Sequence, residues 1–327
     1  MALDPPESFP SINRGYNSVF TPRQLSVGLV APLEPYDRHQ IPTLESHVER
    51  IQLAEKLGFS AIWLRDIPFN VDSFGDTGQV HDPFVYLGLL AARTSTIALG
   101  VASIILPLRH PAHVAKAAAS ADALSGGRLI LGVASGDRPD EYPAMNVPFD
   151  DRSARFREAF EYIEYMAQTR PSFENSYGAP SDSMDMVPKP PGGRLPLIIT
   201  GASQQSPEWL AQHGDGWMTY PMAAPTYQGQ MIDKYRADLD RAGRPPLPVI
   251  QPLHVDLRDD SVEPPTPVHL GFRLGIDQLV EHLRDLERNG VNHVALNLRF
   301  SQSPIEQTLE RLAESVLPEF SEVRKQQ

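Results

Sequence analysis

Short apolar runs alternate with longer amphipathic segments along most of the chain. Residues 25–31 (LSVGLVA) form an apolar run next to prolines, which is typical of a buried strand. Residues 43–57 then place apolar side chains at helical intervals, which predicts a helix with one buried face. Gly58 follows where a C-cap glycine belongs, and residues 61–64 (AIWL) form the next predicted strand.

The same alternation continues towards the C-terminus. Further predicted strands lie at residues 97–101, 128–133, 197–200, 216–219, 249–255 and 294–298. A capping box at residues 303–306, with Pro304 as the first helical residue, predicts that the last helix begins there. Eight strands that alternate with helices predict a parallel sheet closed into a (β/α)₈ barrel of the TIM type. No G-x-G-x-x-G follows the first strand, which counts against an open dinucleotide-binding sheet.

The 327 residues are interpreted as one barrel domain, residues 25–327, preceded by an N-terminal extension, residues 1–24. Barrels of about 250 residues with insertions are common as single domains. Residues 173–193 are polar and rich in Pro, Gly and Ser. We interpret them as a loop insertion on the barrel, not as a domain boundary.

Composition and charge narrow the classes of function. Hydrophobic residues make up 41% of the chain, which suffices for a large core, and the net charge is −12 without any basic block. That balance argues against nucleic acid and anionic membrane surfaces as partners. The N-terminus has no signal-peptide pattern and cysteine is absent, so we expect a cytoplasmic protein. No H-E-x-x-H or cysteine cluster is present, so we expect no metal site.

Three segments, in this order and spacing, resemble the bacterial luciferase-like family of flavin-dependent monooxygenases. They are residues 97–112 (IALGVASIILPLRHPA), 123–142 (ALSGGRLILGVASGDRPDEY) and 195–217 (LPLIITGASQQSPEWLAQHGDGW). The similarity extends over most of the chain from Leu25 to Phe320. The resemblance implies reduced FMN as cofactor, O₂ as second substrate, a separate flavin reductase and a homodimer.

A loop of small and polar residues follows the strand at residues 197–200. Small residues let backbone N–H groups approach an anion, and the helix expected from Ser206-Pro207 adds the positive end of its dipole. The resemblance places the flavin phosphate on this loop, where two side chains can add donors; an ordinary strand–helix turn is the alternative. The loop consists of Gly201, Ala202, Ser203, Gln204 and Gln205.

Four further residues are candidates for the cofactor site. Ala102 and Ser103 follow the third strand, and the family often has a non-proline cis peptide bond there, packed against the flavin ring. Ser135 lies at the end of the fourth strand, where some luciferases carry an arginine near the phosphate. Tyr220 follows the sixth strand and is a candidate neighbour of the ring.

The segment after the second strand departs from the family pattern. Many members carry Glu-His or Asp-His there, whereas this chain has Asp66-Ile67. Asp66 is the remaining catalytic candidate, able to orient a ligand or accept a proton if buried. A salt bridge with Arg65 or Arg109 is the alternative interpretation.

Phe272 and Arg273 are the candidates for substrate contact. They follow a proline-rich loop after the seventh strand, and loops at that end of a barrel carry specificity. Phe272 would cover the ring and Arg273 would bind an anionic group. A structured crossover with a solvated arginine is the alternative.

The sequence therefore favours a flavin-dependent oxidoreductase, and within that class a monooxygenase that uses reduced FMN and O₂ on a small organic substrate. An F420-dependent hydride-transfer oxidoreductase of the same superfamily is the first alternative. A non-catalytic flavin-binding protein and a metal-dependent barrel hydrolase are alternatives from other classes.

Overall fold

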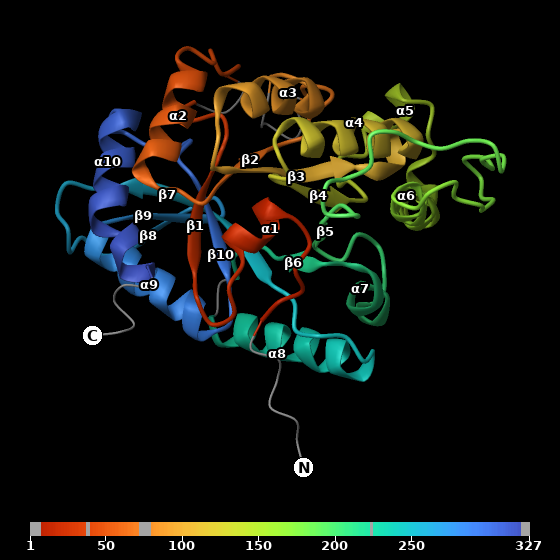
Figure 1. Cartoon of the computed structure of the whole chain (residues 1–327). Coiled ribbons are helices and arrows are strands. Elements are labelled where there is room, and N and C mark those ends of the chain that lie inside the picture. Colours follow the sequence, from red (N-terminus) through yellow and green to blue (C-terminus); the bar gives the residue numbers. More distant parts are fainter. Residues whose placement is uncertain (1–7, 37–39, 72–79, 223–224, 322–327) are drawn as a thin grey trace.

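A closed ring of parallel strands forms the centre of the protein (Figure 1). The computed structural model describes residues 8–36, 40–71, 80–222 and 225–321. Each strand of the ring pairs with the next, and the last pairs with both its predecessor and the first. The predicted (β/α)₈ barrel is therefore confirmed. Its strands are β1 (Ser26–Val30), β2 (Ala61–Leu64), β3 (Ala98–Ile105), β4 (Leu129–Ala134), β5 (Leu197–Thr200), β6 (Gly216–Met218), β7 (Val249–Leu257) and β10 (His293–Asn297).

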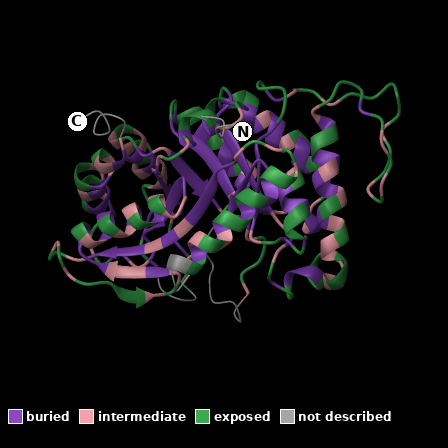
Figure 2. Ribbon diagram, turned by 90° about the horizontal axis from the view of Figure 1, so that it is seen from below, coloured by how far each residue is buried: buried purple, intermediate pink, exposed green. Residues whose placement is uncertain are grey.

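Helices surround this ring, with their apolar faces turned inwards and their exposed faces outwards (Figure 2). A large apolar cluster fills the space between strands and helices, and a smaller one fills the barrel itself. No helix in the described part of the chain is long and apolar enough to cross a membrane. The main helices are α2 (His47–Leu57), α3 (Pro83–Arg93), α4 (Pro111–Leu124), α6 (Arg152–Met166), α7 (Pro207–His213), α8 (Pro225–Arg241), α9 (Ile276–Arg288) and α10 (Ile305–Ser315).

The predicted helix ends are partly confirmed. Gly58 ends α2 in the left-handed region, with φ 93°, as the sequence predicts. The predicted capping box at the start of α10 is wrong, because Pro304 is the N-cap and no side chain caps the helix. Glu306 instead forms an ion pair with Arg50 at 2.6 Å, so its carboxylate does not reach back to the N-cap amide.

The predicted insertion lies between α6 and β5. No helix or strand longer than a single bridge forms between residues 167 and 196, and the segment extends away from the barrel beside α6 (Figure 1). The Lys189 ammonium donates to the carbonyl groups of Met166 and Gln168 at 3.0 and 2.6 Å. These hydrogen bonds hold the second half of the insertion against the C-terminal end of α6.

The proline-rich segment after β7 differs from the loop expected from the sequence. It contains β8 (Thr266–Val268) and β9 (Gly271–Leu274), which pair antiparallel with each other. The first half of β7 pairs with β10, while residues 254–257 continue beyond that contact and pair with β9. The length of β7 explains the difference, since its outer half needs a partner for its backbone groups.

The described residues before β1, from residue 8 onwards, close the amino-terminal end of the barrel. Helix α1 (Arg14–Val19) lies there, and the Tyr16 hydroxyl donates to the Asp215 carbonyl at 2.8 Å. The Asn13 amide donates to the Leu129 carbonyl at 2.8 Å. A Cβ at Gly15 would lie 2.5 Å from the Arg128 carbonyl oxygen, so only glycine permits this close approach. Part of the predicted N-terminal extension, residues 1–24, thus contributes to the core of the barrel.

His293 is fully buried in the barrel near this end. The Trp63 indole donates to its Nε2 at 2.8 Å, and the Ser26 hydroxyl lies 2.7 Å from its Nδ1. Because Nε2 accepts a hydrogen bond, the proton of the neutral ring is on Nδ1. Burial lowers the pKa of His293 to about 3, so the ring stays neutral in the folded protein at all moderate pH values.

Because His293 stays neutral in the folded protein, we expect the protein to lose stability in acid. Between pH 6.5, the ordinary value, and about 3, the unfolded chain binds a proton at this residue that the folded protein does not bind. The free energy of unfolding should therefore fall by about 1.4 kcal/mol for each pH unit below 6.5 on account of His293. We expect His293→Gln to show a correspondingly shallower pH dependence in urea unfolding between pH 4 and 7. Equal slopes in the two proteins would contradict this assignment.

Candidate active site

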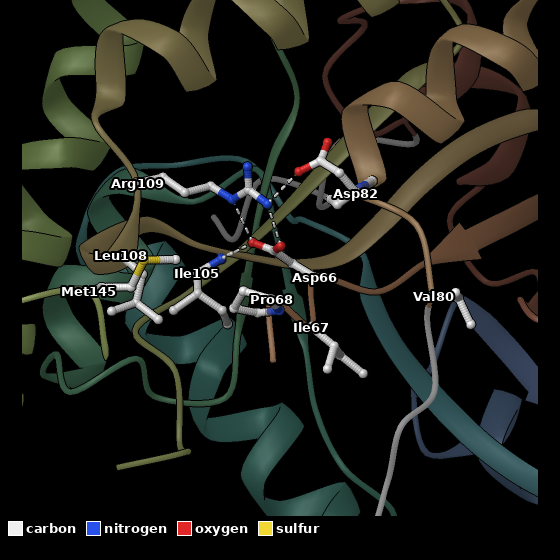
Figure 3. A pocket seen from close by; sticks show the side chains of 10 residues that line it. Asp66, Ile67, Pro68, Val80, Asp82, Ile105, Leu108, Arg109 and Met145 are labelled. Carbon is white, nitrogen blue, oxygen red and sulfur yellow. Dashed lines mark hydrogen bonds and ion pairs between the residues drawn. The ribbon is translucent and has the colours of Figure 1, made fainter. Parts of the chain in front are cut away.

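A cavity of about 420 Å³ opens at the carboxyl ends of β2 and β3 (Figure 3). Active sites of (β/α)₈ barrels lie at this end of the strands. Asp66, Asp82 and Arg109 provide its charged groups. Its walls are otherwise mainly apolar, and include Ile67, Pro68, Val80, Ile105, Leu108 and Met145.

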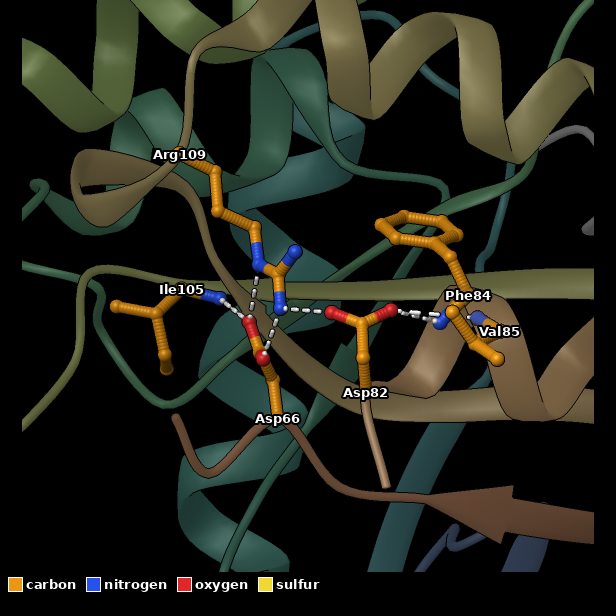
Figure 4. A network of polar contacts seen from close by, with 6 residues as sticks. All are labelled: Asp66, Asp82, Phe84, Val85, Ile105 and Arg109. Atoms are coloured by element: carbon orange, nitrogen blue, oxygen red, sulfur yellow. Dashed lines mark hydrogen bonds and ion pairs between the residues drawn. The ribbon is translucent and has the colours of Figure 1, made fainter. Parts of the chain in front are cut away.

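Asp66 and Arg109 form the central ion pair of this cavity (Figure 4). The guanidinium donates through Nε and Nη2 to the two carboxylate oxygens of Asp66, at 2.9 and 2.6 Å. The Ile105 N–H donates to the same carboxylate at 3.1 Å. Nη2 also reaches Asp82 at 2.8 Å. Of the two interpretations of Asp66, the structure therefore shows the salt bridge with Arg109, and a catalytic role for Asp66 stays a prediction.

Asp82 joins this ion pair to α3. Its other carboxylate oxygen accepts hydrogen bonds from the N–H groups of Phe84 and Val85 at 2.9 and 3.2 Å (Figure 4). An aspartate N-cap satisfies amides of the first helical turn that have no partner within the helix. The start of α3 is thus fixed to the ends of β2 and β3 through Arg109.

Ala102 and Ser103 lie near the end of β3, next to the end of β5. Their peptide bond is cis, as the resemblance implies. The Ser103 hydroxyl is buried and forms a hydrogen bond with the Thr200 hydroxyl. Ser135 is buried after β4, and its carbonyl accepts a hydrogen bond from the Tyr142 hydroxyl. The structure therefore brings three of the predicted cofactor residues to neighbouring strand ends.

The loop after β5 turns sharply and presents backbone amides. Gly201, Ser203 and Gln204 have φ of 58°, 46° and 60°, so three of four successive residues adopt the left-handed region. The N–H groups of Ala202, Ser203 and Gln204 make no hydrogen bond to any residue that the structure describes. Successive unpaired amides of this kind form an anion-binding concavity, and α7 begins directly after the loop.

The side chains of Ser203 and Gln205 do not provide the hydrogen-bond donors that the sequence analysis expects for the phosphate. The Ser203 hydroxyl donates to the Thr200 carbonyl at 2.8 Å. The Gln205 amide donates to the Ser153 carbonyl at 2.9 Å and accepts from Arg157 at 2.9 Å. The expected extra donors of Ser203 and Gln205 are therefore used inside the protein, where they hold the loop against α6. The backbone amides remain as the donors for an anion.

Tyr220 lies beside this loop. Its ring carbon Cε2 is 3.7 Å from the position of a Cβ on Gly201, and the residue is 44% exposed. A partly exposed ring next to an anion-binding loop is compatible with contact to a planar ligand, and its role as a cofactor neighbour stays a prediction.

Glu141 is a buried acid that the sequence analysis did not single out. It is 2% exposed, its Oε1 has no hydrogen-bond partner among the described residues, and Arg138 lies 3.8 Å away. Burial raises the pKa of Glu141 to about 7, the charge of Arg138 opposes this rise, and the charges of Asp66 and Asp137 add to it. The segment Asp137–Glu141 offered four charged residues after a strand, but no pattern in the sequence shows which of them is buried.

Phe272 and Arg273 do not line this cavity. The Phe272 ring contacts His282 of α9, with 5.1 Å between ring centroids, and packs against the outer apolar cluster. Arg273 forms an ion pair with the buried Asp256 at 2.6 Å. The alternative interpretation, a structured crossover, describes both side chains better than the predicted substrate contact, although Arg273 is ion-paired rather than solvated.

No group of three or more His, Asp or Glu side chains that could hold a metal ion occurs within the part of the chain that the structure describes.

Known proteins are similar to this chain over most of its length. A family model described as luciferase-like monooxygenase matches residues 18–264. An uncharacterised protein of Mycobacterium tuberculosis is 28% identical over 281 residues, which cover 76% of this chain and 94% of that protein. An F420-dependent glucose-6-phosphate dehydrogenase of Kineococcus radiotolerans is 28% identical over 214 residues, 64% of this chain and 62% of that enzyme.

Among solved structures, an F420-dependent secondary alcohol dehydrogenase superposes with a TM-score of 0.75 at 19% identity. The match covers 91% of this chain and 100% of that one. At this identity the likeness establishes the fold and no more.

Proposed function

This chain belongs to the luciferase-like monooxygenase family and is an enzyme of that oxidoreductase superfamily, and from this premise we propose that it binds a phosphate-bearing flavin or deazaflavin at the carboxyl ends of β3, β4 and β5. The single observation that carries the proposal is the row of unpaired amides at Ala202, Ser203 and Gln204. An anionic phosphate is the group that such a row fits. The family assignment favours an enzyme over a non-catalytic flavin-binding protein.

Each part of the site has a separate task in this proposal. The amides of the 201–205 loop hold the phosphate, while Ala102, Ser103 and Ser135 border the ring. The ion pair of Asp66 and Arg109 fixes the cavity in which the substrate lies. When bound, the cofactor supplies the redox chemistry, by hydride transfer for F420 or by activation of O₂ for reduced FMN. Glu141, whose pKa burial raises to about 7, is the acid that this chain offers for proton transfer.

F420 is the cofactor that we favour. The dehydrogenase of Kineococcus radiotolerans, which is 28% identical to this chain, is named as F420-dependent. Reduced FMN with O₂, supplied by a separate reductase, is the second candidate, because the family model is described as a monooxygenase.

A titration of the purified protein with F420, FMN and riboflavin tests the proposal. We expect F420 to bind about tenfold or more tightly than FMN, and riboflavin, which lacks the phosphate, to bind weakest. Fluorescence of each ligand reports binding without any need for a substrate. Tighter binding of FMN would select the second candidate, and equal binding of FMN and riboflavin would contradict the phosphate site.

We also propose that the protein is a homodimer formed through α3. Its outer face carries Val85 and Leu89, which are 74% and 39% exposed, together with the exposed Ala92. A Cβ on Gly88 would meet nothing within 4 Å, so the space beside this glycine is open. Light scattering after size-exclusion chromatography should give twice the chain mass of 36.2 kDa, and Val85→Glu should shift it towards one chain mass.

A further inference from the structure

We infer that the cavity beside Asp66 prefers an apolar substrate without negative charge over phosphorylated and carboxylated compounds. This inference rests on the proposed function only in calling the ligand a substrate. It concerns the charge and the polarity of the cavity, which are properties of this chain independent of the cofactor.

Apolar side chains make up most of the cavity wall. Ile67, Pro68 and Val80 lie on one side, and Leu108 and Met145 lie on the other (Figure 3). Where many family members carry a histidine, the wall has Ile67. Removing apolar surface from water is the main driving force available for binding here, which favours a ligand with a hydrocarbon body.

The charged groups of the wall leave a surplus of negative charge. Asp66 and Asp82 contribute two carboxylates, while Arg109 contributes the single cation among the lining residues. Both carboxylates already contact the Arg109 guanidinium, at 2.6 and 2.8 Å. The side chain of Asp66 is only 2% exposed, so water screens its charge poorly. The cavity therefore carries a net charge of −1, with its cation already neutralised.

An anionic ligand would meet this surplus charge at short range. At a separation of about 6 Å and an effective dielectric constant of about 20, the repulsion between two unit charges corresponds to roughly 100-fold in affinity. Screening at the exposed side of the cavity reduces this figure, so we expect a preference of at least about tenfold for a neutral ligand over its anionic counterpart.

Acetophenone and benzoate provide a matched pair, because they have the same ring and similar shape but differ by one charge. We expect acetophenone to bind measurably and benzoate to bind at least about tenfold more weakly, as measured by ligand-observed NMR at pH 7. Ile67→Trp, whose larger side chain narrows the cavity, should weaken the binding of acetophenone. An unchanged affinity in that variant would place the ligand elsewhere and overturn the inference.

Asp82→Asn tests the role of charge directly. Asparagine keeps an oxygen that can cap α3, while the variant removes one negative charge from the wall. Benzoate affinity should rise at least about threefold, and acetophenone affinity should stay the same. Asp240→Asn, an equal change of charge at an exposed residue of α8, should leave both affinities unchanged. The inference fails if benzoate binds as tightly as acetophenone, if Asp82→Asn leaves the ratio unchanged, or if acetophenone does not bind.

These outcomes are separable from those of the cofactor titration. Binding of F420 or FMN without the charge preference would leave the proposed function intact and remove the inference. A charge preference in a protein that binds neither cofactor would support the inference and contradict the proposed function.

Discussion

Ala202→Asp is expected to weaken binding of the phosphate-bearing cofactor by at least about 100-fold. Ala202 is exposed, and its N–H is one of the three unpaired amides of the 201–205 loop. The new carboxylate would stand within about 5 Å of a phosphate held by these amides. At an effective dielectric constant of about 20, one pair of like charges at that separation costs roughly 3 kcal/mol. Fluorescence titration with the cofactor that binds the parent protein measures the loss.

Two controls separate charge from damage to the fold. Ala237→Asp places the same charge at an exposed position of α8 and should leave the affinity unchanged. Riboflavin has the ring of FMN without the phosphate, so its affinity should change little in Ala202→Asp. A folded Ala202→Asp variant with undiminished cofactor affinity would refute the assignment of the phosphate to this loop.

Arg109→Met should lower the free energy of unfolding at pH 7 by about 3–5 kcal/mol, because it leaves the buried carboxylate of Asp66 without its counter-charge. The Asp66 side chain is 2% exposed, and of its described hydrogen bonds only that from the Ile105 N–H would remain. Methionine preserves most of the apolar stem of arginine, so lost packing contributes little. Urea unfolding measures the change, and a loss below about 1 kcal/mol would show that the pair is as weak as a surface one.

A double variant isolates the electrostatic part of this loss. Asp66→Asn combined with Arg109→Met removes both charges and leaves an acceptor for the Ile105 N–H, so we expect it to recover more than half of the stability. Arg288→Met breaks an ion pair on α9 in which both side chains are more than half exposed. That control should cost at most about 1 kcal/mol.

The fold was predictable because each strand is short, apolar and followed by a helix. Residues 61–64 and 197–200 are predicted and observed with the same bounds. The hairpin of β8 and β9 was missed because prolines lie in it and because its pairing depends on the length of β7, a relation between distant segments. The docking of α1 was missed for the same kind of reason, since its partners lie more than a hundred residues away.

The part of the candidate site that depends on backbone geometry could be predicted from the sequence. The 201–205 loop combines glycine and small residues after a strand, and the amides of Ala202, Ser203 and Gln204 make no hydrogen bond to a described residue. Side-chain partners were not predictable in the same way. Gln205 is held by Arg157, and Glu141 is buried with an oxygen that accepts no hydrogen bond from the described residues. Both facts depend on how helices pack, which the local pattern of residues does not encode.

The closure of the barrel by α1 has a consequence for how the chain is made. Tyr16 lies 199 residues before its hydrogen-bond acceptor, Asp215. At a synthesis rate of about 5–20 residues per second, that acceptor leaves the ribosome roughly 10–40 s after the helix. During this interval the buried side of α1 has no completed surface on which to dock. The floor of the barrel can close only once β6 exists, and the ring only once β10 exists.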